Sequence, residues 1–410
     1  MTARRITASL LVILVSATWL PGCVNHTLKS TSVPPINTAS RVIPDHQLLN
    51  VGIPIFDAGI ENYEEDKQIY PEVRKAEANF MPQQLAEAMQ ESAAWGAVRV
   101  IPDNKQITDL LVEGRILHSD GETLELHVVA TDSRHQIWLD RKYKTLASRY
   151  AYSISTREHN DPFQAVYNMI ANDLLTAHEQ LLAQDFKTIR LTTELRFARS
   201  FSPDSFDGYL NQDRKGAYLI LRLPAENDPM LERIRGLRER DHLFIDTMQG
   251  HYSAFNAAMM IPYQDWRKLS FEEVQALREL KEQTTRHLIA GAIAIVGGIA
   301  AATSDSRYSR AAGNVAVVGG GYLLKSGIDK RIEAQIHVEA LEELGLSLEA
   351  EIAPQIIELE DRTVLLSGNV QDQYDQWREI LADIYRAEIG DLSTPAEQAE
   401  LDARSDDAKP

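Results

Sequence analysis

The chain has 410 residues, of which 44% are hydrophobic and 25% are charged, and its formal net charge is −18 at pH 7. This length is enough for two or three domains with substantial cores. The negative charge repels phosphate backbones, so we expect no nucleic acid partner, and its simplest consequence is solubility.

The first 22 residues have the pattern of a secretory signal peptide. Two basic residues, Arg4 and Arg5, precede an apolar stretch over residues 6–20, and Pro-Gly leads from it to Cys23. A basic start, a hydrophobic middle and small residues at the cut define such a leader. The apolar stretch is shorter than the ~20 residues that a membrane span needs. We therefore expect residues 1–22 to be removed.

The sequence Leu-Pro-Gly-Cys at residues 20–23 resembles the lipobox of bacterial lipoproteins. The resemblance implies that Cys23 becomes the first residue, carries a diacylglyceryl thioether and is acylated, for example with palmitate, on its amino group. Val24 is not the aspartate that retains enteric-type lipoproteins at the inner membrane, so an outer-membrane anchor facing the periplasm is implied. The alternative is an ordinary buried thiol. Cys23 is the chain's one cysteine, so no disulfide within the chain is expected.

Residues 23–45 are expected to form a flexible tether, because they are rich in Ser, Thr, Asn and Pro. An apolar, β-branched run over residues 48–57 then predicts a buried strand, and residues 97–101 predict a second one. Between them, residues 71–92 predict a helix with apolar side chains at helical spacing. Pro82 fits this helix if it lies in the first turn.

Three strands in a meander follow, over residues 110–116, 124–128 and 137–143, where apolar and polar residues alternate. Alternation predicts an antiparallel sheet with one buried face. Asp161 and Pro162 then predict the cap and first turn of an amphipathic helix.

This order of elements predicts one α/β module over residues 46–186. Placed behind a lipidated cysteine, it resembles the small module shared by the curli-secretion lipoprotein CsgG, the amino-terminal domain of TolB and LpoB-type activators of peptidoglycan synthases. The resemblance covers about a third of the chain and rests on topology and on the runs Val51-Gly-Ile-Pro-Ile-Phe-Asp57, Leu111-Val-Glu-Gly-Arg115 and Asp120-Gly-Glu-Thr-Leu124. It implies a docking or oligomerising element rather than an enzyme.

Residues 187–287 are predicted to be mostly helical. One long helix begins at Asp228 and Pro229, and the capping box Ser-Phe-Glu-Glu at residues 270–273 predicts the start of another. The apolar stripes of these helices are interpreted as core.

Residues 288–328 change character and resemble a glycine-zipper hairpin. Two uncharged runs flank a polar bend, and small residues recur at every fourth position: Ala290, Ala294, Gly298 and Ala302 in the first run, and Ala312, Ala316 and Gly320 in the second. Such rows let helices pack closely, in lipid or in a homo-oligomer. The first run, over residues 288–303, reaches only about 24 Å against a hydrocarbon core of about 30 Å. Membrane contact and burial within protein both stay open.

Residues 329–390 predict a helix, a β-hairpin around residues 360–362 and a last amphipathic helix, and residues 391–410 predict a disordered acidic tail. The fold class is therefore α+β. It comprises an N-terminal module with a mixed, mainly antiparallel sheet, a helical middle, an apolar helical hairpin and a small C-terminal β-hairpin with a helix.

Several strings approach catalytic motifs and lack a required residue. The Gly-rich run at residues 319–326 has Leu324 where a phosphate-binding loop needs glycine, and His178-Glu179 has Leu182 where a zinc protease needs its second histidine. Asp241, His242, Asp246 and His251 form a conceivable metal cluster, but a salt-bridged helix surface is the better interpretation. We expect no catalytic residues, no cofactor and no metal.

These observations predict a non-enzymatic, outer-membrane-anchored lipoprotein. It would act as a scaffold or assembly factor in the cell envelope, self-associating through the Gly-rich hairpin, with an envelope protein as partner. The alternative is an activator of a peptidoglycan synthase or other cell-wall enzyme, or a subunit of a secretion complex.

Overall fold

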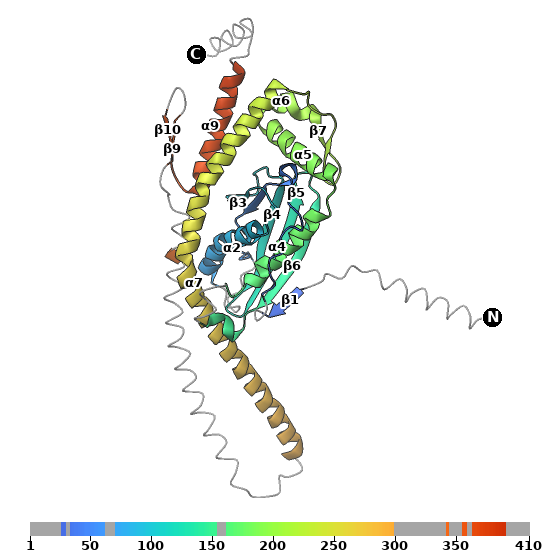
Figure 1. Cartoon of the computed structure of the whole chain (residues 1–410). Coiled ribbons are helices and arrows are strands. Elements are labelled where there is room, and N and C mark those ends of the chain that lie inside the picture. The colour runs from blue at the N-terminus through green and yellow to red at the C-terminus, as the bar shows by residue number, and fades with distance from the viewer. Residues whose placement is uncertain are drawn as a thin grey trace, which may run out of the picture.

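The computed structural model describes residues 26–29, 33–61, 70–153, 161–298, 342–343, 355–358 and 363–390. The fold is α+β, which confirms the predicted class. A mixed sheet fills the N-terminal half, and helices follow it in the chain (Figure 1).

The main sheet has six strands in the order β1-β6-β5-β4-β2-β3. Its strands are β1 (His26–Lys29), β2 (Val51–Pro54), β3 (Val98–Ile101), β4 (Leu110–Ser119), β5 (Thr123–Asp132) and β6 (Ile137–Leu146). Strands β4, β5 and β6 pair antiparallel, whereas β2 lies parallel to both β3 and β4. Along β5, every second residue is buried, so the meander and its single buried face are confirmed.

Helices α2 (Pro71–Glu91) and α4 (Gln164–Glu179) pack against the buried face of the sheet (Figure 1). Pro82 lies inside α2 rather than in its first turn, where Pro71 stands. A proline cannot donate to the carbonyl four residues earlier. Here the freed carbonyl of Ala78 accepts a hydrogen bond of 3.0 Å from the backbone N–H of Phe56. The carbonyl that Pro82 leaves without a helical partner thus connects α2 to the segment just after β2.

Within the segment predicted as a flexible tether, residues 34–40 dock on α4. Asn168 and Asn172, one helical turn apart, donate from their amides to the carbonyls of Pro34 and Pro35, at 2.8 and 3.0 Å. Asn172 also accepts from the backbone N–H of Asn37 at 2.8 Å. Upstream, β1 pairs in parallel with β6. The carbonyls of the two prolines thus accept hydrogen bonds from helix side chains rather than from a strand.

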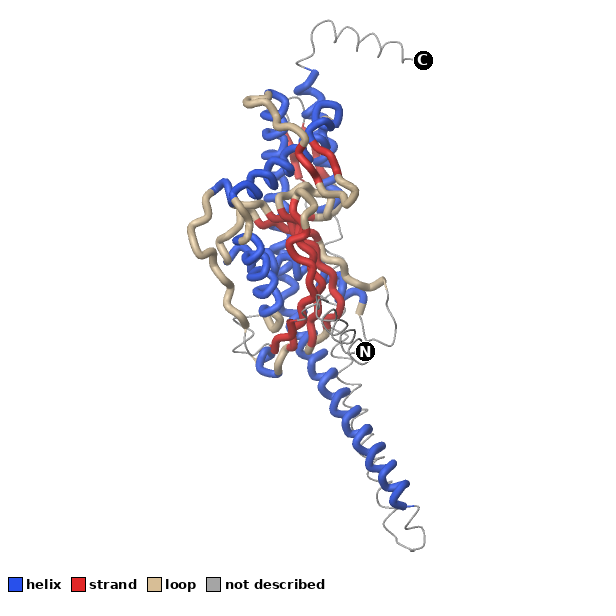
Figure 2. The backbone as a smooth tube through the Cα atoms, turned by 90° about the vertical axis from the view of Figure 1, so that its right-hand side faces the viewer, coloured by secondary structure: helices blue, strands red, loops and turns tan. Residues whose placement is uncertain are grey.

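Helix α7 (Pro229–Gly298) is continuous over 70 residues, so the predicted new helix at Ser270 is wrong. The Ser270 hydroxyl does not cap a helix; it accepts a hydrogen bond of 3.1 Å from the backbone N–H of Gly121. The helix also runs across position 288, where the apolar hairpin was expected to begin. Figures 1 and 2 show its C-terminal part projecting beyond the rest of the described fold.

The remaining elements complete the described part of the fold. They are η1 (Asp45–Gln47), η3 (Arg149–Tyr152), α5 (Ala183–Phe201), α6 (Pro203–Phe206), η4 (Asp207–Tyr209), β7 (Leu210–Gln212), β8 (Tyr218–Ile220), β9 (Gln355–Glu358), β10 (Thr363–Leu366) and α9 (Val370–Gly390). The C-terminal β-hairpin and last helix are as predicted. Side chains of the helical middle, such as Ile234 and Tyr263, belong to the same core as the sheet.

Candidate functional site

The most unusual site is the interface at which α7 packs on the sheet module, around Arg267 and Asp161, a charged pair in the core. We call this interface the α7 seat. Arg267 is 0% exposed, and its guanidinium donates to both carboxylate oxygens of Asp161, at 3.1 Å for the Nη1 bond. It also lies 3.9 Å from the ring centroid of Tyr263. Burial alone lowers an arginine pKa, but the carboxylate of Asp161 raises the pKa of Arg267 above its usual value.

A second buried carboxylate joins the same seat. Glu77 of α2, 0% exposed, accepts hydrogen bonds of 2.5 Å from the hydroxyls of Tyr263 on α7 and Ser119 on β4. Burial, together with the charge of Glu77, raises the pKa of Tyr263, so its hydroxyl stays protonated and donates. These hydrogen bonds join α2, β4 and α7, three elements that are distant in sequence.

Gly121 explains how closely α7 approaches. A Cβ at this position would lie 2.0 Å from the carbonyl oxygen of Arg267 and 2.1 Å from the backbone nitrogen of Phe271. Only glycine lets the β4–β5 turn contact the helix backbone. Next in the chain, Glu122 accepts from Gln275 at 2.7 Å and pairs with Arg278. The seat of α7 therefore extends to Arg278.

Beyond Arg278, α7 forms what we call the arm, residues 279–298. At 1.5 Å per residue it is about 30 Å long. Its last eleven residues, 288–298, are uncharged. Strand β1 lies toward the end of the sheet from which the arm projects (Figures 1 and 2).

The predicted site residues divide between two parts of the chain. Ala290, Ala294 and Gly298 lie four residues apart on the helical backbone of the arm. Cys23, Ala302, Ala312, Ala316 and Gly320 lie outside the described residues. Within the described part of the chain, no helix is both long and apolar enough to cross a membrane.

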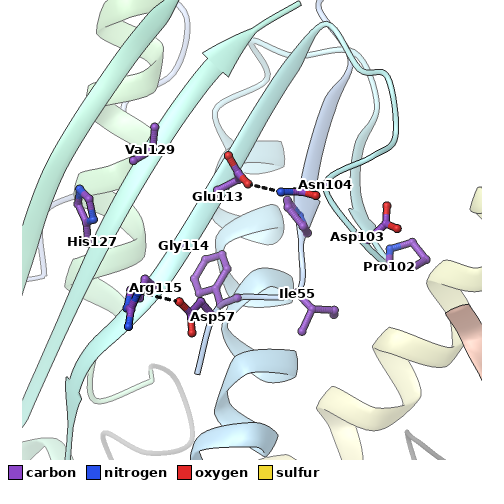
Figure 3. A pocket seen from close by; sticks show the side chains of 12 residues that line it. Ile55, Asp57, Pro102, Asp103, Asn104, Glu113, Gly114, Arg115, His127 and Val129 are labelled. Carbon is purple, nitrogen blue, oxygen red and sulfur yellow. Dashed lines mark hydrogen bonds and ion pairs between the residues drawn. The ribbon is translucent and has the colours of Figure 1, made fainter. Parts of the chain in front are cut away.

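An open groove of about 440 Å³ lies on the face of the sheet opposite α2 and α4 (Figure 3). Asp57, at the end of β2, pairs with Arg115 at 3.2 Å, and Glu113 accepts from the amide of Asn104 at 2.8 Å. The ring of Phe56 forms the floor, packed so tightly against Gly114 that a Cβ there would lie 2.6 Å from the ring. These carboxylates are paired with a cation or an amide, an arrangement suited to recognition of a polar surface.

The two carboxylates of the conceivable metal cluster, Asp241 and Asp246, belong to two separate ion pairs. Asp246 accepts two hydrogen bonds from Arg99 of β3, at 2.6 and 2.8 Å. Asp241 is buried beside Arg378 of α9, and burial raises its pKa to about 6. Burial lowers the pKa of His242 to about 4. No group of metal-ligating side chains gathers in the portion of the chain that the structure describes.

Sequence reasoning missed the α7 seat. Asp161 was interpreted as a helix cap; its carboxylate does accept from the backbone N–H of Phe163 at 2.8 Å, but α4 begins only at Gln164. Arg267 lies four residues after Tyr263, on the apolar stripe of α7. A charged residue within an apolar stripe is the one signal that could have indicated a buried pair.

No protein-family profile matches the chain, and neither curated proteins nor solved structures yield a match.

Proposed function

We propose that this protein is a non-enzymatic scaffold or assembly factor of the bacterial cell envelope, anchored to the outer membrane through a lipid on Cys23 and facing the periplasm. The arm and the residues that follow it, up to residue 328, provide contact with the membrane or with a second copy of the chain. The leader and lipobox support the anchor, and the α7 seat supports the contact.

The observation that carries the proposal is the continuity of α7 from its contacts with the sheet module into the arm. A helix of marginal stability in isolation gains its register from tertiary contacts. Here Arg267, Glu77 and Gly121 give α7 one register on the module, so the uncharged residues 288–298 are held at a defined distance from it. The uncharged run of the sequence, residues 288–303, reaches about 24 Å as a helix against a hydrocarbon core of about 30 Å, which favours partial insertion or pairing between copies over a span.

The docked tether sharpens the geometry of the anchor. Strand β1 begins at His26, three residues after Cys23, so the chain allows at most about 11 Å between Cys23 and the edge of the sheet. A lipid on Cys23 therefore keeps the module close to the membrane, and it does so at the end toward which the arm projects (Figure 1).

Cell fractionation tests the anchor. We expect Cys23→Ser to move the protein from the membrane to the soluble fraction and to abolish palmitate labelling. The matched control Ser32→Ala keeps wild-type behaviour. Membrane retention of the Cys23→Ser protein without label would overturn the lipid anchor.

Light scattering of detergent-solubilised protein tests self-association. We expect full-length protein to be a homo-oligomer and the variant lacking residues 288–328 to be a monomer. Gly298→Leu, which removes a small residue from the predicted row, should weaken the oligomer, whereas Ile295→Leu should not. If full-length protein is itself a monomer, the self-association part is refuted.

The open groove favours one alternative, an activator that docks on a cell-wall enzyme. Cross-linking in intact cells separates the two: capture of a peptidoglycan synthase supports the activator, and capture of a second copy or of other envelope proteins supports the scaffold.

A further inference from the structure

The hairpin of β7 and β8 has an open backbone edge. The backbone N–H of Leu221 donates to the carbonyl of Tyr209 at 2.8 Å. The backbone N–H and C=O groups of odd-numbered residues therefore point toward β7, and those of even-numbered residues point away from it. Tyr218 accordingly donates outward to the carbonyl of Arg134 at 3.0 Å. By the same pairing, the backbone N–H and C=O of Ile220 point away from β7. This edge can accept another strand.

An apolar row accompanies this edge. Leu219 lies in β8, and Leu221 and Leu223 follow at alternate positions just beyond the strand; their side chains are 52%, 61% and 71% exposed. Single exposed leucines are ordinary on a protein surface, but three at alternate positions in and directly after an edge strand form a surface for apolar side chains.

The charges around the hairpin are mainly basic, in a chain of net charge −18. Arg196 stacks on Tyr218 at 4.6 Å and Arg222 stacks on Tyr209 at 4.0 Å, and Lys215 is exposed in the turn. The described structure gives these three cations no carboxylate within ion-pair distance. An incoming segment with acidic side chains would find complementary charge here.

A pocket of about 350 Å³ lies beside the hairpin and offers a seat for one such side chain. Arg196, Lys215 and His135 line it, together with Glu113 and Asp132. Those two carboxylates are already engaged, Glu113 by the amide of Asn104 and Asp132 by Arg134 at 2.7 Å.

Gln106, 9% exposed, also lines this pocket, and within the described structure neither polar atom of its amide has a hydrogen-bond partner. Elsewhere in the protein, the amide of Gln249 donates to the carbonyl and accepts from the N–H of Val100, both at 2.9 Å. A glutamine amide can therefore pair with one residue of an extended chain, and Gln106 offers the same pair of groups.

We propose that the β7–β8 hairpin docks a partner protein, which adds an extended segment of alternating acidic and apolar residues to the outer edge of β8. The edge of β8 can pair with an extended chain. The leucine row would contact the apolar side chains of that chain, and the cations would pair with its acidic side chains. Figure 1 places β7 toward the end of the fold opposite the arm, away from the proposed membrane. The inference rests on the scaffold function for its biological meaning, but the binding can be measured without the anchor acting.

Fluorescence anisotropy with full-length protein in detergent tests the proposal. The probes are three labelled, capped peptides: Glu-Val-Glu-Val-Glu-Val-Glu, its analogue with lysine in place of glutamate, and its analogue with glycine in place of valine. We expect the first to bind at least about tenfold more tightly than the other two, and its affinity to fall with rising salt.

Two variants with equal exposure locate the site. Leu221→Ser should weaken binding of the first peptide by about tenfold, because it removes one buried leucine from the complex. Leu243→Ser, on α7 and also 61% exposed, should leave binding unchanged. Far-UV circular dichroism checks that both variants are folded.

Equal binding of all three peptides, or an unaffected Leu221→Ser protein, would overturn the proposal. So would tighter binding at this site of the chain's own residues 391–410 as a peptide, or of anionic phosphatidylglycerol vesicles, each lost with Leu221→Ser. Failure of the scaffold function would be separate, because it would appear in the fractionation of the Cys23→Ser protein and not in peptide binding.

Discussion

The buried pair of Arg267 and Asp161 allows a quantitative test of how α7 is held. Both side chains are almost entirely removed from water, at 0% and 2% exposure. Replacing Arg267 with methionine keeps the apolar stem and leaves the carboxylate of Asp161 in the core without its cation. Breaking a buried ion pair from one side costs about 3–5 kcal/mol of stability. Asp161→Leu should cost a similar amount, because it strands the guanidinium.

The double variant should cost clearly less than the two single variants together, because neither partner is then left as an unpaired buried charge. We expect a coupling energy of about 2 kcal/mol or more. Urea unfolding is followed by tryptophan fluorescence, to which Trp266, buried next to Arg267, contributes. Single variants within about 0.5 kcal/mol of wild type, or strictly additive losses, would refute the idea that this pair seats α7.

Two further predictions concern the same helix. Gly121→Ala should lower the urea midpoint, because its Cβ would collide with the backbone of α7, whereas Gly236→Ala, with open space around it and in a helix, should raise stability by about 1 kcal/mol; equal effects would contradict the close approach. The pKa of Asp241, raised to about 6, means that the folded state holds a proton that the unfolded state releases above about pH 4, so this group's contribution to stability falls from pH 4 to 6. His242, with its pKa lowered to about 4, has the opposite slope, its contribution being lost as pH falls from 6.5 to 4. Asp241→Asn should therefore be more stable than wild type at pH 6.5, by up to about 3 kcal/mol, and should gain stability from pH 4 to 6.5 more steeply; an unchanged pH profile would contradict the raised pKa.

Local patterns predicted the sheet module well. Period-two alternation in β4, β5 and β6 follows directly from one buried face, and the order of strands and helices could be predicted from periodicity alone. The C-terminal hairpin and α9 were also predictable, because turn residues and an apolar stripe are short-range signals.

Other elements depended on contacts that no local pattern reveals. The capping box at Ser270 is a genuine short-range signal, yet Trp266 and Phe271 on either side are buried in the same core, so the helix continues. Pro82 is tolerated inside α2 because a strand residue, Phe56, satisfies the carbonyl that it frees. The tether composition indicated flexibility, and only Asn168 on α4 and its neighbours make it dock.

By itself, the sequence determined the order of the elements from β2 to α4, the buried face of the sheet, and the leader and lipobox from which the anchor is inferred, since each rests on residues adjacent in the chain or one helical turn apart. Tertiary structure alone decided that α7 is a single continuous helix held on the module by the pair of Arg267 and Asp161, residues 106 positions apart. It also decided that Leu219 of β8 and the two leucines after it lie near a pocket lined by Arg196 and Lys215. Burial of charge, backbone approach and edge exposure are properties of segments brought together in space, and one-dimensional periodicity carries no information about them.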